Sequence, residues 1–219
     1  LNPFNVILGF TDSLIENFES WDEKQKLEVL GYVKDSSENA FNLLENLLHW
    51  SRSQKGMIDF NPAFIGASRT INSVLNEVSS FALKKEVEVV NLFNDDVLKV
   101  YADENMFRLI CRNLIMNAIK FSNPSGKVFI DVEPDYKQSY LRFSIRDEGV
   151  GMEKEKAEIL FNSENNSSTR GTKGEKGVGL GLVLCLDFVK AHKGEIWVES
   201  QINKGTTIYF TIPKSTARK

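Results

Sequence analysis

The segment that most constrains the fold of this chain is residues 105–122, an amphipathic stretch with two distinct faces. Apolar residues recur there at spacings of three and four, as on the buried side of an α-helix: Phe107, Ile110, Cys111, Leu114, Ala118 and Phe121. Asn113, Asn117 and Lys120 form a polar stripe beside that face. Asparagine disfavours a helix interior because its amide competes for backbone hydrogen bonds. The pattern predicts a packed helix whose polar stripe holds a ligand, with a capped or solvated helix as the alternative.

Two glycine-rich segments follow this helix and make the prediction of a site more specific. The first, residues 147–151, reads Asp-Glu-Gly-Val-Gly and ends a stretch that alternates like a β-strand, residues 140–146. The second, residues 171–181, is crowded with glycines and opens another helical pattern. Each segment alone is common. Their order along one chain, after an Asn/Lys helix, is much more specific.

This ordered set resembles the ATP-binding domain of sensor histidine kinases, within an ATPase superfamily shared with DNA gyrase, mismatch-repair ATPases and a heat-shock chaperone. The three segments correspond to that family's N, G1 and G2 boxes, and the resemblance covers nearly the whole chain. It implies ATP and Mg²⁺ as ligands. The expected fold class is α+β: a helical hairpin, followed by an α/β sandwich of the histidine kinase/gyrase type with one mixed sheet and helices on one face.

The resemblance assigns the base pocket to the first glycine segment. Asp147 would accept a hydrogen bond from the adenine amino group, which would disfavour guanine because guanine has a carbonyl there. Gly149 and Gly151 would shape the pocket, and Phe121 and Ile159 would wall it. The alternative for this segment is a plain turn.

The resemblance assigns phosphate and metal binding to the helix stripe and the second glycine segment. Asn117 would bind Mg²⁺ with Asn113 in support, since amide oxygens suit a hard cation or its waters. Lys120 would contact phosphate, and glycine N–H groups at a helix N-terminus suit phosphate as well. The remaining expected ligands come from this second segment: Arg170, Lys173, Lys176, Gly177, Gly179, Leu180 and Gly181. A dinucleotide-binding loop is disfavoured, because a polar run rather than a strand precedes it.

The N-terminal part of the chain reads as two helices, residues 1–18 and 23–53, joined by a turn. The second helix carries a near-heptad apolar seam: Leu27, Leu30, Val33, Ala40, Leu44, Leu47 and Leu48. Two such helices cannot bury both apolar stripes alone, so a second copy is expected to complete a dimeric four-helix bundle. We expect a dimerisation and phosphoacceptor hairpin at 1–55, a linker at 56–62 and an ATP-binding domain at 63–219.

The opening residues resemble the end of the kinase H box, whose usual form is His-(Asp/Glu)-Leu-x-Asn-Pro. The chain begins Leu-Asn-Pro-Phe, which implies that the phosphoacceptor histidine lies just upstream of Leu1. Asn2 then matches the position that orients water for hydrolysis of the partner's phospho-aspartate, so it is the expected phosphatase residue. As it stands, the chain is expected to bind ATP but not to phosphorylate itself. The alternative for Asn-Pro is a simple helix start.

Other residues carry less information. The histidines, His49 and His192, lack the H-box pattern and are expected in surface or capping roles. Cys111 and Cys185 lie in apolar patterns and are expected to be buried free thiols. The net charge of -3 gives no sign of a nucleic-acid or membrane partner. No apolar run spans a bilayer, so membrane attachment is expected only through parts of the protein outside this sequence.

Together these features predict the cytoplasmic core of a membrane-anchored histidine kinase in a two-component system. Phosphate would pass from ATP to histidine and then to an aspartate of a response-regulator receiver domain. Two alternatives remain. A gyrase-type ATPase clamp is disfavoured by the preceding helical hairpin. A pseudokinase, a dimeric scaffold that binds a regulator without transferring phosphate, is disfavoured by the intact Asn117, Asp147 and glycine loops.

Overall fold

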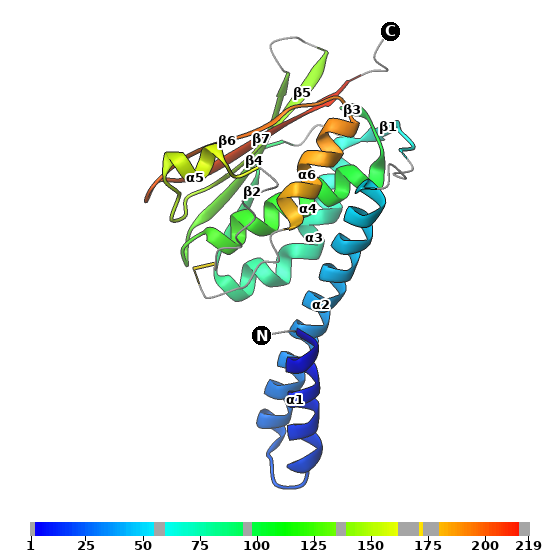
Figure 1. Cartoon of the computed structure of the whole chain (residues 1–219). Coiled ribbons are helices and arrows are strands. Elements are labelled where there is room, and N and C mark those ends of the chain that lie inside the picture. The colour runs from blue at the N-terminus through cyan, green and yellow to red at the C-terminus, as the bar shows by residue number, and fades with distance from the viewer. Residues whose placement is uncertain are drawn as a thin grey trace. The chain divides into compact units, whose positions relative to one another are not determined.

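The computed structural model describes residues 3–54, 60–93, 98–134, 139–161, 171–172 and 180–214. Its contacts divide the chain into two compact units, Leu1–Met57 and Ile58–Lys219 (Figure 1). None of the described helices is long and apolar enough to cross a membrane. Each unit has its own architecture and is considered separately.

The first unit is a helical hairpin of α1 (Pro3–Glu16) and α2 (Glu23–Gln54). Asp22 caps α2 reciprocally with Gln25: Gln25 N–H donates to Asp22 Oδ1 at 2.7 Å, and Asp22 N–H donates to Gln25 Oε1 at 3.0 Å. The hairpin leaves much of its apolar surface in solvent, because α1 has no buried residue and several large apolar side chains are exposed. Those of the predicted seam include Leu27, Leu30 and Leu44.

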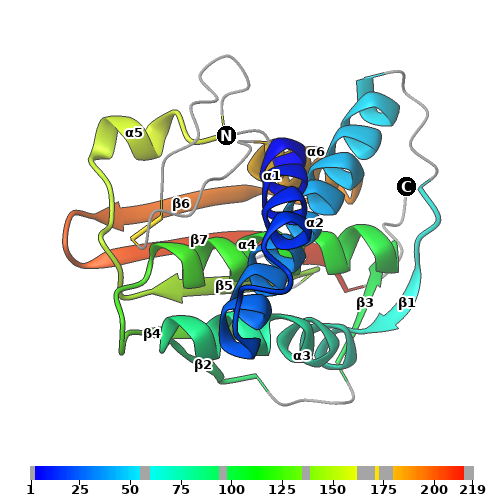
Figure 2. The same ribbon diagram turned by 90° about the horizontal axis from the view of Figure 1, so that it is seen from below.

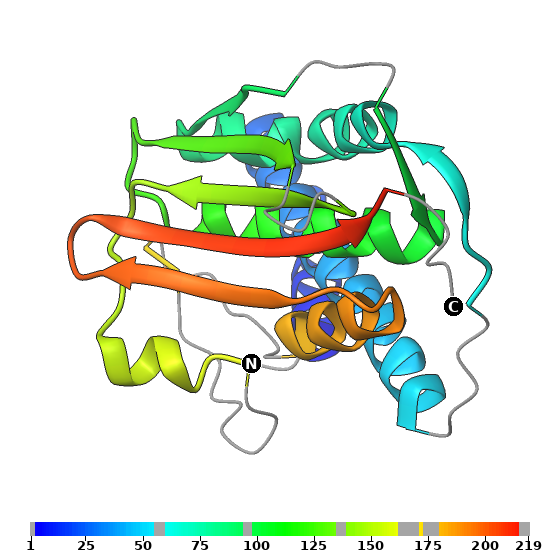
Figure 3. The ribbon, with the colours of Figure 1, turned by 90° about the horizontal axis from the view of Figure 1, so that it is seen from above.

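The second unit contains a five-stranded sheet of order β2-β4-β5-β7-β6 (Figure 3). Its strands are β2 (Glu88–Asn91), β4 (Lys127–Pro134), β5 (Tyr140–Asp147), β7 (Gly205–Pro213) and β6 (Ile196–Gln201). The β2–β4 pair is parallel and the other three pairs are antiparallel, so the sheet is mixed. A separate antiparallel pair joins β1 (Ala63–Gly66) to β3 (Lys99–Ala102).

Helices cover one face of this sheet. They are α3 (Ala67–Lys85), α4 (Glu104–Phe121) and α6 (Leu180–Ala191), while the short α5 (Lys154–Glu158) lies beside β6 (Figures 2 and 3). A hairpin of helices followed by a mixed sheet with helices on one face confirms the predicted α+β class.

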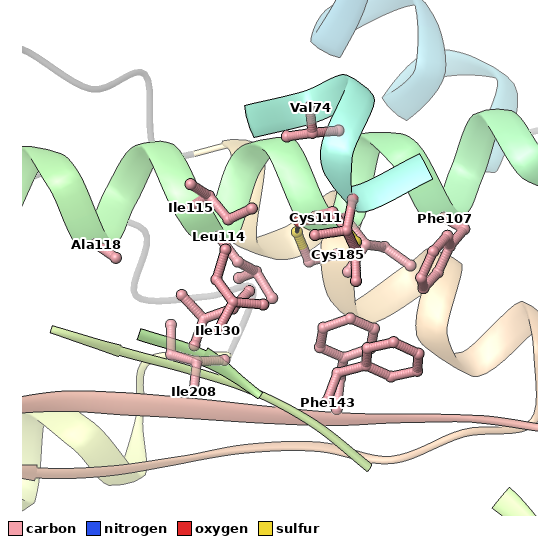
Figure 4. Packing of buried hydrophobic residues seen from close by; sticks show 14 of the residues in the cluster. Val74, Phe107, Cys111, Leu114, Ile115, Ala118, Ile130, Phe143, Cys185 and Ile208 are labelled. Atoms are coloured by element: carbon pink, nitrogen blue, oxygen red, sulfur yellow. Dashed lines mark hydrogen bonds between the residues drawn. The ribbon is translucent and has the colours of Figure 1, made fainter. Parts of the chain in front are cut away.

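The core forms where α4 packs on the sheet, and the predicted apolar face of this helix is the face that is buried (Figure 4). Phe107 contacts Phe143 edge-on at 5.2 Å between ring centroids, and Phe143 stacks on Phe210 at 4.9 Å. Asp103 caps the start of α4 by accepting a hydrogen bond from Met106 N–H at 3.1 Å. Five buried positions of the predicted face follow one another along the helix: Phe107, Ile110, Cys111, Leu114 and Ala118.

The cysteines behave as the sequence predicts. Cys111 and Cys185 are free and buried, on α4 and α6. Burial raises the pKa of both thiols, that of Cys185 to about 12. Thiols held this far in the neutral form are unreactive packing groups.

His192 lies in the interior rather than at the surface, with 2% of its area exposed. Its Nε2 accepts a hydrogen bond from Asp103 N–H at 2.9 Å, and its Nδ1 lies 2.7 Å from the carbonyl oxygen of Phe188. These partners fix a neutral ring with the proton on Nδ1, and burial lowers its pKa. The histidine therefore joins the end of α6 to the start of α4.

Candidate functional site

The first glycine segment lies against the end of α4. A Cβ atom at Gly149 would lie 2.7 Å from the carbonyl carbon of Phe121, closer than real side chains allow, so only glycine fits. Val150 N–H donates a hydrogen bond to the Phe121 carbonyl at 3.3 Å. Gly151 turns the chain with a φ of 62°, which favours glycine. The turn after β5 is thereby fixed against the last residue of the helix.

The start of α6 lies against the middle of the same helix. A Cβ atom at Gly181 would lie 3.3 Å from Asn113 Oδ1, so the Asn113 side chain abuts the first turn of α6. The amide nitrogen of Asn113 is buried and has no hydrogen-bond partner in the described part of the chain. Asn117 and Lys120, both partly exposed, follow Asn113 along the same stripe of α4. The structure thus brings the turn after β5 and the start of α6 together against α4.

Asp147 is the most perturbed carboxylate at this site. It ends β5, is 5% exposed, and accepts hydrogen bonds at Oδ1 from Gly149 N–H at 2.9 Å and Thr206 N–H at 3.2 Å. Burial raises its pKa to about 6, an effect that the two backbone bonds partly oppose. Within the described residues its other oxygen, Oδ2, makes no hydrogen bond, so it can accept one from a ligand.

The side chains at the end of α4 border the site. Lys120 Nζ lies 5.0 Å from the centre of the Phe121 ring, and Phe121 is only partly buried. Ile159, expected to wall the base pocket, is 41% exposed. The other expected site residues lie outside the described residues: Asn2, Arg170, Lys173, Lys176, Gly177, Gly179 and the side chain of Leu180.

Two residues at this site were missed by the sequence reading. Thr172 N–H donates to the Lys120 carbonyl at 3.2 Å, and Thr172 Oγ1 donates to the Ser122 carbonyl at 2.7 Å. Lys85, at the end of α3, is 2% exposed and its Nζ also donates to the Lys120 carbonyl. The sequence signals are weak, because Thr172 stands in a polar run and Lys85 follows another lysine.

The donor set decides which metal the site can hold. No cluster of three or more His, Cys, Asp or Glu residues capable of holding a metal occurs among the described residues. The stripe on α4 offers the amide groups of Asn113 and Asn117 instead. A few neutral oxygen donors suit Mg²⁺ that keeps its waters and binds together with phosphate oxygens.

Sequence comparison places this arrangement in a known family. The sequence profile of the histidine kinase-, DNA gyrase B- and HSP90-like ATPases matches residues 102–216. The chain belongs to this family. The match includes α4, the turn after Asp147 and the start of α6, so the ATPase domain contains all three segments of the site.

Relatives of the ATPase domain identify it as the histidine kinase type. The chain is 29% identical over 214 residues to sensor histidine kinase WalK of Bacillus subtilis, covering 96% of this chain and 34% of WalK. It is 27% identical over 205 residues to the adaptive-response sensory kinase SasA of Crocosphaera subtropica, covering 93% of this chain and 53% of SasA. The chain therefore spans only part of either relative.

Solved structures share the fold. The catalytic domain of histidine kinase ThkA is 27% identical, with a TM-score of 0.60 over 70% of this chain and 96% of that chain. Full-length ShkA in complex with AMPPNP has a TM-score of 0.70 at 20% identity, over 100% of this chain and 47% of that chain. ThkA in complex with response regulator protein TrrA has a TM-score of 0.66 at 21% identity, over 100% of this chain and 59% of that chain.

Proposed function

We propose that this chain is the core of a sensor histidine kinase that binds Mg-ATP along α4 and delivers its γ-phosphoryl group to a histidine. The observation that carries the proposal is the meeting of two glycine-containing segments with the polar stripe of α4. Gly149 and Val150 touch Phe121 at one end of the stripe, and Gly181 touches Asn113 at the other. Asn117 and Lys120 lie between them along the stripe.

Each part of this arrangement suits one part of ATP. Asp147 Oδ2 accepts a hydrogen bond from the adenine amino group, at the end of α4 that carries Phe121. Lys120 neutralises phosphate charge, and the N-terminus of α6 adds backbone donors and its positive dipole end. Asn117 holds Mg²⁺, which supplies charge neutralisation at the phosphates when bound. Phosphoryl transfer depends mainly on such positioning and electrostatic stabilisation.

The comparisons support a nucleotide and a regulator as ligands. ShkA shares the fold and was solved with AMPPNP, a non-hydrolysable ATP analogue, and ThkA was solved with the response regulator TrrA. We assign the corresponding partners here: Mg-ATP, and a receiver domain whose aspartate takes the phosphoryl group. The ATP pool lies in the cytoplasm, so this chain would act on the cytoplasmic side of a membrane-anchored sensor.

The hairpin is proposed to dimerise, because its apolar stripes are uncovered in one chain. Sedimentation of the chain at micromolar concentration is expected to show a dimer. Leu27→Glu should shift it to monomer, since Leu27 is 66% exposed on the predicted seam and a buried unpaired charge is costly. Leu83→Glu is the matched control, because Leu83 is 78% exposed on α3 in the other unit. A monomeric wild type, or equal effects of both variants, would refute the hairpin dimer.

Transfer to histidine separates the kinase from the pseudokinase alternative. This chain is expected not to incorporate phosphate from labelled ATP. Asn2 remains the proposed phosphatase residue. A longer version that includes the natural residues before Leu1 should incorporate acid-labile, base-stable phosphate, releasing ADP, and should pass it to a receiver domain. Asn117→Ala in that version should abolish the incorporation. A long version that binds nucleotide without any incorporation would support the pseudokinase.

A further inference from the structure

The carbonyl groups at the end of α4 find their partners far away in the sequence. The last carbonyls of any helix lack intrahelical donors and need other ones. The Ala118 carbonyl is satisfied locally, by Ser122 N–H at 3.0 Å and Ser122 Oγ at 2.8 Å. The Lys120 carbonyl instead receives donors from Lys85 and Thr172. The end of this helix is therefore shaped by tertiary contacts.

Lys85 approaches the helix end from α3. A lysine this deeply buried is unusual unless its ammonium is satisfied, and here Nζ donates to the Lys120 carbonyl. A cation at a helix C-terminus also interacts favourably with the helix dipole. Lys85 thus supplies both a donor and a compensating charge at the last turn of α4.

Thr172 approaches the same turn from the start of the second glycine-rich segment. Its N–H and Oγ1 both reach the Lys120 carbonyl, at 3.2 and 3.4 Å, and Oγ1 lies 2.7 Å from the Ser122 carbonyl. A single hydroxyl therefore spans the carbonyls on either side of Phe121. Valine has the same shape but cannot donate, whereas serine keeps the hydroxyl.

Lys120 and Phe121 project from the turn that these two residues hold. We infer that Lys85 and Thr172 are positioning residues for nucleotide binding: by fixing the Lys120 carbonyl they set where the Lys120 ammonium stands, an inference that rests on the proposed function. Neither residue needs to touch the nucleotide. Their effect on affinity should pass through Lys120.

The first test compares two threonine-to-valine variants in the whole chain by calorimetric titration with Mg-AMPPNP. Thr172→Val is expected to weaken binding about tenfold, on the scale of one or two lost hydrogen bonds, while Thr172→Ser stays within about twofold. Thr70→Val is the matched control, since Thr70 is buried and its hydroxyl bonds the Gly66 carbonyl at the start of α3, away from the site. It should leave affinity within about twofold.

The second test substitutes Lys85 and then combines substitutions at Thr172 and Lys120 in a double-mutant cycle. Lys85→Met should weaken binding about tenfold, whereas Lys84→Met, at the exposed neighbouring position, should not. In a Lys120→Ala background, Thr172→Val should reduce affinity little further, because the Lys120 ammonium group through which Thr172 acts is already absent. Simple loss of stability would give additive effects instead. If Lys85→Met fails to fold, the threonine comparison and this cycle decide the matter.

The outcomes separate the inference from the function on which it rests. If wild-type protein binds Mg-AMPPNP but Thr172→Val binds like Thr70→Val, or its effect adds fully to that of Lys120→Ala, the positioning role is wrong and the proposed function stands. If folded wild-type protein does not bind the nucleotide, the proposed function fails and this inference fails with it.

Discussion

Asp147→Asn is expected to weaken binding of ATP analogues by about 10- to 100-fold, the scale of a lost hydrogen bond to a charged group. Oδ2, which makes no hydrogen bond within the described residues, is the proposed acceptor for the adenine amino group, and an amide nitrogen in its place would present a donor instead. The unliganded domain should be as stable as wild type or more stable. Asparagine keeps an oxygen for Gly149 N–H and Thr206 N–H and removes a carboxylate that burial disfavours.

The raised pKa of Asp147, about 6 against an ordinary 3.8, makes this variant informative across pH. Between those values the folded state keeps the proton that the unfolded state has lost. The stabilising contribution of Asp147 is therefore complete below pH 3.8 and is lost as pH rises through about 6. Nucleotide binding should show the opposite trend, because the acceptor must be ionised: affinity should fall as pH drops through about 6.

Calorimetric titrations and thermal melts between pH 5 and 8 would measure both effects. Asp131→Asn, at an exposed position of β4 in the same sheet, is the control for removing one carboxylate. Equal nucleotide affinity in Asp147→Asn and wild type would show that this carboxylate does not bind the adenine base. A large loss of stability in Asp147→Asn would show that its charge supports the fold.

Gly149→Ala is expected to destabilise the ATPase domain by about 1–3 kcal/mol or more, the range for forcing extra atoms into a packed site. The new methyl group would overlap the Phe121 carbonyl carbon at 2.7 Å and Asp147 Oδ1 at 2.8 Å. Backbone cannot rotate away as a flexible side chain can. Relief requires the turn to move off the end of α4, which would separate Asp147 from Phe121 and weaken nucleotide binding as well.

Urea unfolding of the variant measures this cost directly. Gly66→Ala is the matched control, because a Cβ atom there meets only Arg69 Cβ at an ordinary 3.8 Å. It precedes α3 as its N-cap without a side-chain bond, so its cost should stay near or below about 1 kcal/mol. A Gly149→Ala protein as stable as Gly66→Ala would mean that the contact between the turn and α4 is loose.

Local pattern was enough to predict the elements that build the site. The three-and-four spacing from Phe107 to Ala118 predicted the buried face of α4, because helix periodicity is a local property of the sequence. That the segments at Asp147 and Gly181 meet on this helix is a matter of long-range packing. The sequence pointed to it only through resemblance to a known family.

Contacts between distant segments explain what the sequence did not show. β2 and β3 follow one another in the sequence, yet β2 joins the main sheet and β3 pairs with β1. His192 was expected in a surface or capping role. It does bond the Phe188 carbonyl at the end of α6, but its burial and its bond to the distant backbone of Asp103 were not predicted. Lys85 and Thr172 gave only weak local signals, since their partner at Lys120 is far along the chain. Only the folded structure brings such donors to one carbonyl.

The measurement that tests the central claim most directly is calorimetric titration of this chain with AMPPNP, with and without Mg²⁺, beside Asn117→Ala. The expected result is one site per chain whose affinity rises with Mg²⁺, and Asn117→Ala should lose that magnesium dependence. Mg²⁺ alone should give no heat, because the amide stripe holds the ion only together with phosphate. An absence of nucleotide binding by well-folded protein, or binding that ignores both Mg²⁺ and Asn117, would contradict a nucleotide site along α4.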